Sequence, residues 1–231
     1  MTASTRNAPE TKTKILIVDD HPIVREAIAA RIVSHPDLQV CGEADDVADA
    51  LDKVKALRPD LVIVDLSLKS DQGLDLIKKI KAISEETRTL VSSAFDETLY
   101  AERALHAGAT GYINKQAICE SIVDAVRHVL AGKMYLSQKM TERLLERAVG
   151  GAVQFKETLI KPLTARELEI FTMIGNALST RKIAQQLHLS VKTVETHRER
   201  IKHKLSLSNG AELNREAVRW VLLTEKDYVE W

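Results

Sequence analysis

Two adjacent carboxylates end an apolar run near the start of the 231-residue chain. In the stretch TKILIVDDHP, Asp19 and Asp20 follow directly after Ile15–Val18, and Asp65 ends a second apolar run, LVIVD, in the same manner. Like charges repel one another, so a buried strand end keeps such a pair only where a cation lies beside it. Mg²⁺ takes oxygen ligands and commonly binds one or two carboxylates together with phosphate oxygens. Asp19, Asp20 and Asp65 are therefore candidate ligands of a magnesium ion.

Hydroxyl and ammonium groups follow two later apolar runs. Ser92 and Ser93 come directly after TLV, and Lys115 comes three residues after Tyr112 in GYINK. A carboxylate such as Asp65 can attack phosphorus and form an acyl phosphate, and a metal ion and an ammonium group stabilise the transferred charge. Lys115 would supply the ammonium, and the Ser93 hydroxyl would donate to a phosphoryl oxygen. Each residue taken singly is more often a turn, cap or surface residue; their placement at successive strand ends carries the prediction.

These residues need elements that bring distant strand ends together. Over the first 130 residues, short apolar runs alternate with amphipathic stretches of helical period, which predicts a doubly wound α/β fold with a parallel five-stranded sheet. The predicted strands are Ile15–Val18, Leu38–Cys41, Leu61–Leu66, Leu90–Val91 and Gly111–Ile113, and the predicted helices span about 22–34, 46–57, 73–83, 97–107 and 117–131. Ligands of such sheets bind at the carboxyl ends of the strands, where all the candidate residues lie.

After residue 131 the strand pattern stops. Residues 138–148 have helical period, and VGGAV at 149–153 is a flexible break. Thr164 is followed three residues later by Glu167, a capping box that predicts the start of a helix, and the pattern beyond Pro162 is all-helical. The sequence thus predicts four parts: a flexible tail at 1–13, an α/β domain at 14–131, a linker with a helix at 132–160 and a small all-α domain at 161–231.

The spacing inside the predicted all-α domain indicates a helix-turn-helix. A helix that begins at Ser179 or Thr180 is joined through HLS at 188–190 to VKTVETHRERIKHKL, and so short a link leaves room only for a tight turn. Residues 181–204 carry seven Lys or Arg against two Glu. The second helix of such a pair enters the major groove of double-stranded DNA. The domain is therefore expected to bind DNA.

Helical geometry sorts the residues of that second helix. Its apolar positions, which are expected to face inward, are Val194, Ile201 and Leu205. The side chains on the opposite face, within reach of base edges, are Lys192, Glu195, Thr196 and Glu199. The side chains better placed for phosphates are Thr193, Arg198, Lys202 and His203. His197 either contacts a phosphate or packs against the core.

Composition excludes several classes of protein. The net charge is zero, but residues 14–130 carry 14 Lys and Arg against 20 Asp and Glu, so the rest of the chain carries +6. This division is typical of an acidic domain joined to a nucleic-acid-binding one. No apolar run approaches the roughly 18 residues of a membrane helix, and no secretory signal is recognisable. Cys41 and Cys119 lack CxxC spacing and are expected to be reduced and buried, so we expect a cytoplasmic protein with no membrane partner.

Four stretches of residues 14–131 resemble the receiver domain of two-component response regulators: ILIVDDHPIVREAI, LVIVDLSLKSDQGLDLI, LVSSAFDE and ALHAGATGYINK. The resemblance implies a flavodoxin-like fold and phosphorylation of Asp65 by a sensor histidine kinase. The Mg²⁺ ligands that it implies are Asp19, Asp20, Asp65 and the main-chain carbonyl of Ser67. It also implies that Ser93 supplies the switch hydroxyl, that Tyr112 is the aromatic switch residue and that Lys115 pairs with the phosphate.

The C-terminal part is similar to the DNA-binding domain of response regulators of the NarL/LuxR (FixJ) type. The motifs LTARE, IAQQL and LSVKTVETHRERIKHKL carry this resemblance over about 161–225. Ala177 stands where such domains usually have Gly before LS. The resemblance implies a transcription factor that forms a homodimer on activation or on DNA, with RNA polymerase as a further candidate partner. Phosphorylation of Asp65 would switch dimerisation and DNA binding.

Two other functions fit part of the sequence. A Mg²⁺-dependent phosphohydrolase would use Asp65 as its nucleophile, but such enzymes commonly need an Asp two residues later, where Ser67 stands, and no cap domain is evident. A DNA-binding regulator that works without phosphorylation would have no need of the complete acidic set. We therefore expect a regulator rather than an enzyme, with phosphoryl chemistry limited to phosphorylation and dephosphorylation of Asp65 itself.

Overall fold

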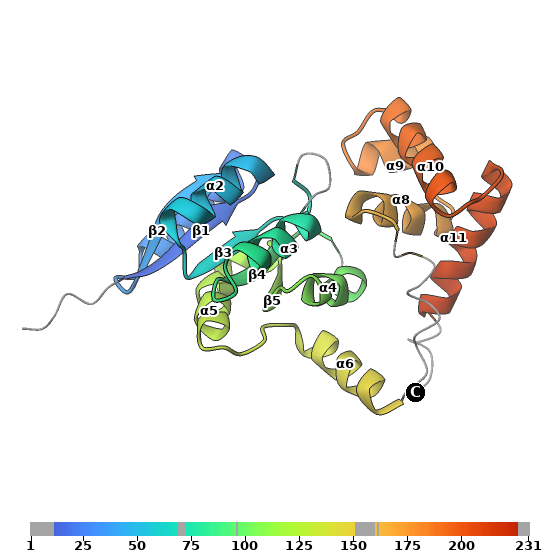
Figure 1. Cartoon of the computed structure of the whole chain (residues 1–231). Coiled ribbons are helices and arrows are strands. Elements are labelled where there is room, and N and C mark those ends of the chain that lie inside the picture. Colours follow the sequence, from blue (N-terminus) through green and yellow to red (C-terminus); the bar gives the residue numbers. More distant parts are fainter. Residues whose placement is uncertain (1–11, 69–72, 96, 151–159, 161, 226–231) are drawn as a thin grey trace, which may run out of the picture. The chain divides into compact units, whose positions relative to one another are not determined.

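The computed structural model describes residues 12–68, 73–95, 97–150, 160 and 162–225, which divide into two units, Met1–Arg143 and Leu144–Trp231 (Figure 1). The strands of the first unit are β1 (Thr13–Val18), β2 (Leu38–Ala44), β3 (Leu61–Val64), β4 (Arg88–Ser93) and β5 (Gly111–Asn114). Its helices are α1 (Pro22–Val33), α2 (Val47–Leu57), α3 (Gly73–Ile83), α4 (Glu97–His106) and α5 (Ile118–Leu130). A 3₁₀ turn, η1 (Lys115–Ala117), follows β5, and α6 (Gln138–Gly150) follows α5. Strand β1 begins one residue inside the predicted tail, and residues 1–11 lie outside the described residues.

The five strands form one parallel sheet in the order β2-β1-β3-β4-β5. Helices α1 and α5 contact each other on one face, while α2, α3 and α4 follow one another across the other face. The predicted doubly wound α/β fold is therefore confirmed. Strand β3 ends at Val64, two residues earlier than predicted, so Asp65 is the first residue after the strand.

The core of the first unit explains why the strand sequences are continuously apolar. Ile15–Val18 and Leu61–Val64 are almost completely buried because helices cover both faces of the sheet. Each such side chain contributes about 2 kcal/mol by leaving water. Cys41 is half-buried, and burial raises the pKa of its thiol. The side chain of Cys119 lies outside what the structure describes.

The second unit is helical, with α8 (Ala165–Gly175), α9 (Thr180–Gln186), α10 (Val191–Lys204) and α11 (Gly210–Glu225). The predicted capping box is confirmed: Thr164 Oγ1 accepts a hydrogen bond from Glu167 N, and Glu167 Oε2 accepts one from Thr164 N. Of the two candidate caps for the next helix, Ser179 is the N-cap residue. Ser190 caps α10 and accepts a hydrogen bond from Thr193 N at 3.0 Å.

The inward positions predicted for the second helix of the helix-turn-helix are buried or half-buried, and α9 has buried apolar positions of its own. The fully or almost fully buried side chains are Ile183, Ala184, Val194 and Ile201, while Leu187 and Leu205 are half-buried. The turn between α9 and α10 contains His188 in the left-handed region, with φ of 52°. Ala177, which stands where a Gly is usual, also has a positive φ, 59°, because α8 ends there.

Candidate functional site

Sheet register brings the predicted carboxylates together. Val18 of β1 is the partner of Val64 of β3, so the next residues, Asp19 and Asp65, leave adjacent strands side by side. Asp65 N donates to the carbonyl of Val18 at 2.9 Å, which fixes the backbone there. Ligand atoms of Asp19, Asp20, His21 and Asp65 all lie within 4.8 Å of one another. The structure therefore brings the adjacent pair Asp19 and Asp20 together with Asp65, which is distant in the sequence.

Lys115 lies against two of these carboxylates. Its Nζ is 2.6 Å from Asp19 Oδ2 and 2.8 Å from Asp65 Oδ2. Burial raises the pKa of Asp65; the Lys115 ammonium opposes this, and the Asp19 charge adds to it. Burial by itself disfavours the charged lysine, but Asp65 and Asp19 together raise the pKa of Lys115 above its ordinary value. The arrangement keeps a cation beside two buried acidic groups.

The donor set fits a hard divalent cation. Asp19 Oδ2 and Asp20 Oδ1 are buried, and among the described residues neither accepts a hydrogen bond of normal geometry, although each lies within ion-pair distance of a basic group. Asp65 Oδ1 accepts a hydrogen bond from Ser67 N at 3.0 Å. Carboxylate oxygens with unused acceptor capacity are the ligands that Mg²⁺ prefers. Ligation by the Ser67 carbonyl stays a prediction.

Two residues of this site were not predicted from the sequence. His21 Nδ1 lies 2.8 Å from Asp20 Oδ1 and 3.2 Å from Asp19 Oδ1, so an imidazole faces the acidic pair. Arg25, one turn into α1, donates from Nη1 to the carbonyl of Asp19 at 2.6 Å and from Nε to Glu43 at 3.3 Å. The signal for His21 was its position directly after the pair. Arg25 lies one helical turn beyond and carried no comparable signal.

The predicted switch residues are both buried, Ser93 at the end of β4 and Tyr112 within β5. Ser93 ends β4, and its Oγ accepts a hydrogen bond from Phe95 N at 3.1 Å. The Tyr112 hydroxyl donates to the carbonyl of Phe95 at 2.9 Å. The register pairs Ser93 with Asn114, directly before Lys115, and pairs Val64, directly before Asp65, with Val91. Ser93 therefore lies at the same edge of the sheet as the acidic cluster.

The candidate DNA-binding side chains all lie on α10, but they are not equally exposed. The exposed side chains include the four predicted to reach base edges, Lys192, Glu195, Thr196 and Glu199, and also His203. Thr193, His197, Arg198 and Lys202 are partly buried. Arg198 Nη2 donates to Asn214 Oδ1 of α11 at 3.3 Å, and Lys202 Nζ pairs with Glu199 Oε2 at 2.9 Å.

His197 has a mixed environment. Its Nδ1 is buried and has no hydrogen-bond partner among the described residues. Burial, followed by the positive charge of Arg200, lowers the pKa of His197 below its ordinary value. The ring is therefore neutral near pH 7, which fits the packing role left open by the sequence better than a phosphate contact.

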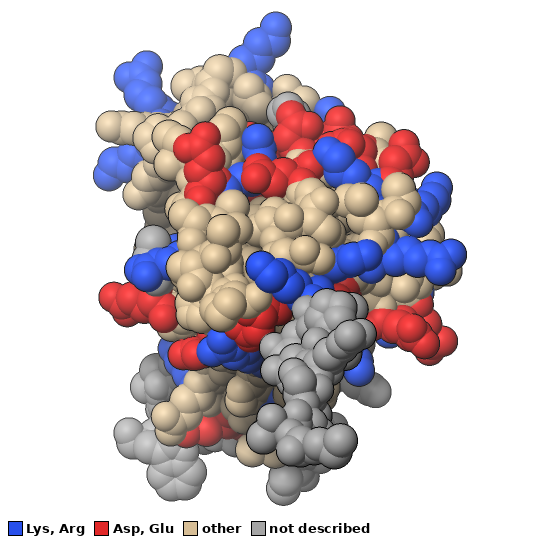
Figure 2. All heavy atoms as spheres, turned by 90° about the vertical axis from the view of Figure 1, so that its left-hand side faces the viewer, with Lys and Arg blue, Asp and Glu red and all other residues tan. Residues whose placement is uncertain are grey.

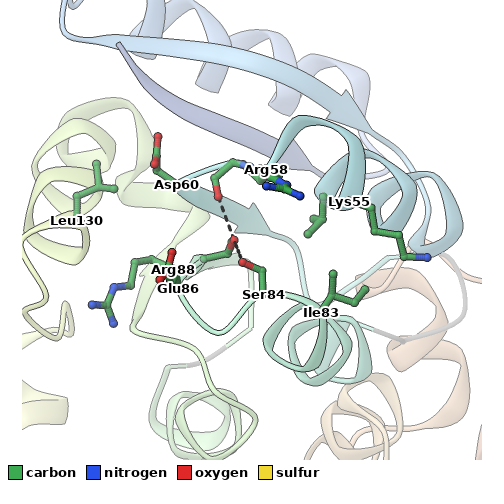
Figure 3. Close-up of a pocket in the computed structure, with 11 residues that line it drawn as sticks. Lys55, Arg58, Asp60, Ile83, Ser84, Glu86, Arg88 and Leu130 are labelled. Atoms are coloured by element: carbon green, nitrogen blue, oxygen red, sulfur yellow. Dashed lines mark hydrogen bonds between the residues drawn. The ribbon is translucent and has the colours of Figure 1, made fainter. Parts of the chain in front are cut away.

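The acidic cluster is separate from a cavity at the opposite end of the strands. That cavity has a volume of about 640 Å³, and its lining includes Arg58, Asp60, Ile83, Arg88 and Leu130, from the amino ends of β3 and β4 and the carboxyl ends of three helices (Figure 3). None of the candidate site residues lines it.

On the face shown in Figure 2, acidic and basic side chains are interspersed. None of the described helices is both long and apolar enough to cross a membrane.

Comparison with known proteins agrees with this geometry. Residues 15–127 match the response regulator receiver domain, and residues 161–217 match the luxR family of bacterial regulatory proteins. The chain is 35% identical over 206 residues to the response regulator GacA of Pseudomonas aeruginosa, covering 89% of this chain and 95% of GacA. The chain belongs to the LuxR-family response regulators. This response regulator is also 36% identical over 214 residues to the oxygen regulatory protein NreC of Staphylococcus carnosus, covering 91% of this chain and 99% of NreC.

Solved structures support the same assignment. A LuxR-family response regulator from an Aurantimonas species matches with a TM-score of 0.56 and 31% identity, covering 60% of this chain and 99% of the other. The RcsB–DNA complex matches in fold with a TM-score of 0.54 and 24% identity, covering 91% of this chain and 100% of RcsB. The response regulator therefore has a receiver domain and a LuxR-type DNA-binding domain in one chain.

Proposed function

We propose that Asp65 accepts a phosphoryl group from a sensor histidine kinase and that this switches dimerisation and binding to double-stranded DNA. The observation that carries the proposal is the position of Asp65: one carboxylate oxygen accepts from Ser67 N, and the other lies 2.8 Å from the Lys115 ammonium. Asp19 and Asp20 lie beside it with unused acceptor capacity. A carboxylate oriented in this way is a suitable nucleophile for phosphorus.

In the proposed step, a carboxylate oxygen of Asp65 attacks phosphorus and forms an O–P bond. The bond from phosphorus to the donor breaks, and its electron pair leaves with the donor's imidazole. Mg²⁺ held by Asp19, Asp20, Asp65 and the Ser67 carbonyl would supply charge stabilisation to the transferred group. Lys115 neutralises charge on a phosphoryl oxygen, and the Ser93 hydroxyl donates a hydrogen bond to another.

The DNA-binding part of the proposal rests on α10. RcsB, which shares the fold, has been solved bound to a promoter in the presence of the phosphomimetic BeF₃⁻. We infer that a cytoplasmic homodimer of the regulator places two copies of α10 on paired half-sites, where RNA polymerase is a further candidate partner. The receiver at 14–131, the linker at 132–160 and the DNA-binding domain at 161–231 are the functional parts of this switch. The residues proposed to contact DNA are Lys192, Thr193, Glu195, Thr196, Arg198, Glu199 and Lys202, while His197, which the sequence also offered as a contact, is assigned to packing.

Phosphorylation with acetyl phosphate and Mg²⁺ tests the proposal. The wild type should gain one phosphoryl group by intact mass, dimerise by light scattering and bind DNA more tightly by fluorescence anisotropy, whereas Asp65→Asn should show none of these changes. Asp75→Asn is the matched control, because Asp75 is an exposed carboxylate of α3 paired with Lys78 at 3.6 Å. Equal phosphate incorporation by Asp65→Asn would exclude Asp65 as the acceptor. Equal activation of DNA binding without incorporation would favour a regulator that does not need phosphorylation.

A further inference from the structure

The chain remains attached to the receiver sheet after α5 ends. Tyr135 forms a parallel bridge with Gly111 of β5: Tyr135 N donates to the Thr110 carbonyl at 3.3 Å, and Tyr112 N donates to the Tyr135 carbonyl at 2.8 Å. Strand β5 is the last strand of the sheet, so Tyr135 satisfies backbone groups on its outer edge. The residues that lead out of the receiver thus extend its sheet by one position.

Gly111 makes this close approach possible. A Cβ atom at Gly111 would lie 3.0 Å from the Cβ and the carbonyl oxygen of Tyr135 and 3.0 Å from Val129 Cγ2. The Tyr135 ring packs edge-on against His128, with ring centroids 5.8 Å apart, and lies against the apolar core of the receiver. A glycine in β5 and a tyrosine beyond the next helix therefore belong to one packing arrangement.

The same segment is attached a second time, to α4. Ser137 N donates to Glu97 Oε1, in the first turn of α4, at 2.8 Å. Ser137 also starts α6, because its Oγ accepts from Met140 N at 3.1 Å, and Met140 is completely buried. Residues 133–140, called the Tyr135 segment below, are thus held by both β5 and α4.

A series of hydrogen bonds joins this segment to the switch hydroxyl. Phe95 N donates to Ser93 Oγ at 3.1 Å, the Tyr112 hydroxyl donates to the Phe95 carbonyl at 2.9 Å, and Tyr112 N donates to the Tyr135 carbonyl. The Phe95 ring stacks on Tyr100 of α4 with centroids 4.7 Å apart. Ser93, Phe95 and Tyr112 are each at most 3% exposed. A change at Ser93 therefore has a buried, directly bonded route to the Tyr135 segment.

We propose that the Tyr135 segment is the part of the regulator that receives the change at Ser93 and transmits it to α6, which it precedes in the chain. This inference rests on the proposed function, since the change at Ser93 is caused there by a phosphoryl group on Asp65. When the Ser93 hydroxyl turns toward a phosphoryl oxygen, Phe95 N loses its acceptor, and the Phe95 carbonyl and Tyr112 shift. The bridge at Tyr135 and the Glu97–Ser137 contact are then loosened, so the segment is held without phosphate and released with it.

Hydrogen exchange of the full-length protein with Mg²⁺ and BeF₃⁻, a phosphoryl mimic, tests this route. In the wild type, BeF₃⁻ should raise exchange in residues 133–143 by about 2- to 10-fold, the range expected for the loss of one hydrogen bond. Glu97→Ala should show the raised exchange before BeF₃⁻ is added and respond little to it. Glu97→Gln keeps an acceptor oxygen and should resemble the wild type. Glu120→Ala removes an exposed carboxylate from the first turn of α5 and should also resemble the wild type.

The two proposals fail in different ways. If residues 88–95 respond to BeF₃⁻ and residues 133–143 do not, the transmission route is wrong while phosphorylation of Asp65 stands. If no residue responds to BeF₃⁻, the proposed function fails. The transmission route is then tested without any phosphoryl mimic, by the variants of the segment itself. Coupling between two sites is reciprocal, so loosening the Tyr135 segment should raise hydrogen exchange at the Phe95 amide. Gly111→Ala is the first variant for this test. If it does not fold, Tyr135→Ala takes its place. Unchanged exchange at the Phe95 amide would overturn the route.

Discussion

At the scale of single residues, the acidic site depends on one lysine that is distant in the sequence. Asp19 and Asp65 are almost completely buried, and the Lys115 ammonium is within ion-pair distance of both. Breaking a buried ion pair by removing one partner is costly, because the remaining charge has neither water nor a counterion. Lys115 is therefore expected to stabilise the folded receiver in addition to its part in the proposed phosphoryl transfer.

This dependence predicts how magnesium should act on a variant without the lysine. Lys115→Gln leaves two buried carboxylates without their cation and should destabilise the receiver by about 3 kcal/mol. Mg²⁺ replaces the missing positive charge, so it should raise the thermal unfolding temperature of Lys115→Gln more than that of the wild type. Differential scanning fluorimetry with Mg²⁺ and with EDTA measures this. Lys79→Gln, an exposed lysine of α3, is the control. An equal Mg²⁺ effect on all three proteins would contradict the prediction.

Gly73 lies close to the backbone of Asp65 and Leu66. A Cβ at Gly73, the first residue of α3, would lie 2.5 Å from the Asp65 carbonyl oxygen and 2.5 Å from Leu66 Cα. Gly73→Ala must displace that backbone, and a barrier increase of about 1.4 kcal/mol would slow phosphorylation of Asp65 about tenfold. The rate of acetyl-phosphate incorporation measures the effect. Gly210→Ala, at a position where nothing lies within 4 Å, should leave the rate unchanged. A wild-type rate in Gly73→Ala would show that the loop tolerates the shift.

At the scale of elements, Glu167 links the start of α8 to the end of α10. Its Oε2 accepts from Thr164 N at 2.8 Å and pairs with Lys204 Nζ at 2.6 Å, and the residue is 2% exposed. Burial disfavours the charged carboxylate, but the hydrogen bonds from Lys204 and Thr164 outweigh it and lower the pKa of Glu167 below 4.5. The interaction joins two helices of the DNA-binding domain that are distant in the sequence.

The sign of this pKa shift sets a pH dependence. Because the pKa of Glu167 is lower in the folded state, its stabilisation is complete above pH 4.5 and is lost as the pH falls through the folded-state pKa. Glu167→Gln should lower the free energy of unfolding of the domain by about 1–3 kcal/mol near neutral pH, with a smaller loss in acid. Urea unfolding followed by Trp220 fluorescence in a Trp231→Phe background measures it. Glu216→Gln, from a partly exposed pair with Arg219 at 3.8 Å, is the control. A loss that does not shrink in acid would contradict the ion-pair explanation.

At the scale of the whole molecule, charge is divided between the two domains. Residues 14–130 have a net charge of −6 and the rest of the chain +6, of which residues 161–231, with 12 Lys and Arg against 9 Asp and Glu, supply +3. Phosphate contacts release counterions from DNA, so affinity should fall steeply as salt is added.

Salt dependence therefore identifies the phosphate contacts. Lys202→Ala should weaken binding about equally for operator and random DNA and reduce the slope of log K against log salt by about 1. Fluorescence anisotropy at several salt concentrations gives the slope. Lys55→Ala, on the receiver, should leave the slope unchanged, since Lys55 is an exposed lysine paired with Asp52 at 3.9 Å. A slope unchanged by Lys202→Ala would remove that residue from the set of phosphate contacts.

Local patterns in the sequence were sufficient to predict the strands, the helices and the residue types at the strand ends. Apolar runs that end next to Asp19, Asp65 and Ser92 predict the strand ends to within two residues, because a parallel strand covered on both faces must be apolar throughout. The capping box of Thr164 and Glu167 is likewise a local pattern. In each case the information lies within a few residues, and so the sequence by itself determined it.

Only the tertiary structure decided which side chains meet. The contact of Lys115 with Asp19 depends on the order of the strands, and the place of Arg25 depends on how α1 packs. The end of the strand pattern at residue 131 predicted a linker, but Tyr135 returns to β5 because Gly111 leaves room for it. Such contacts follow from side-chain direction and packing between segments far apart in the chain, and local periodicity carries no information about either.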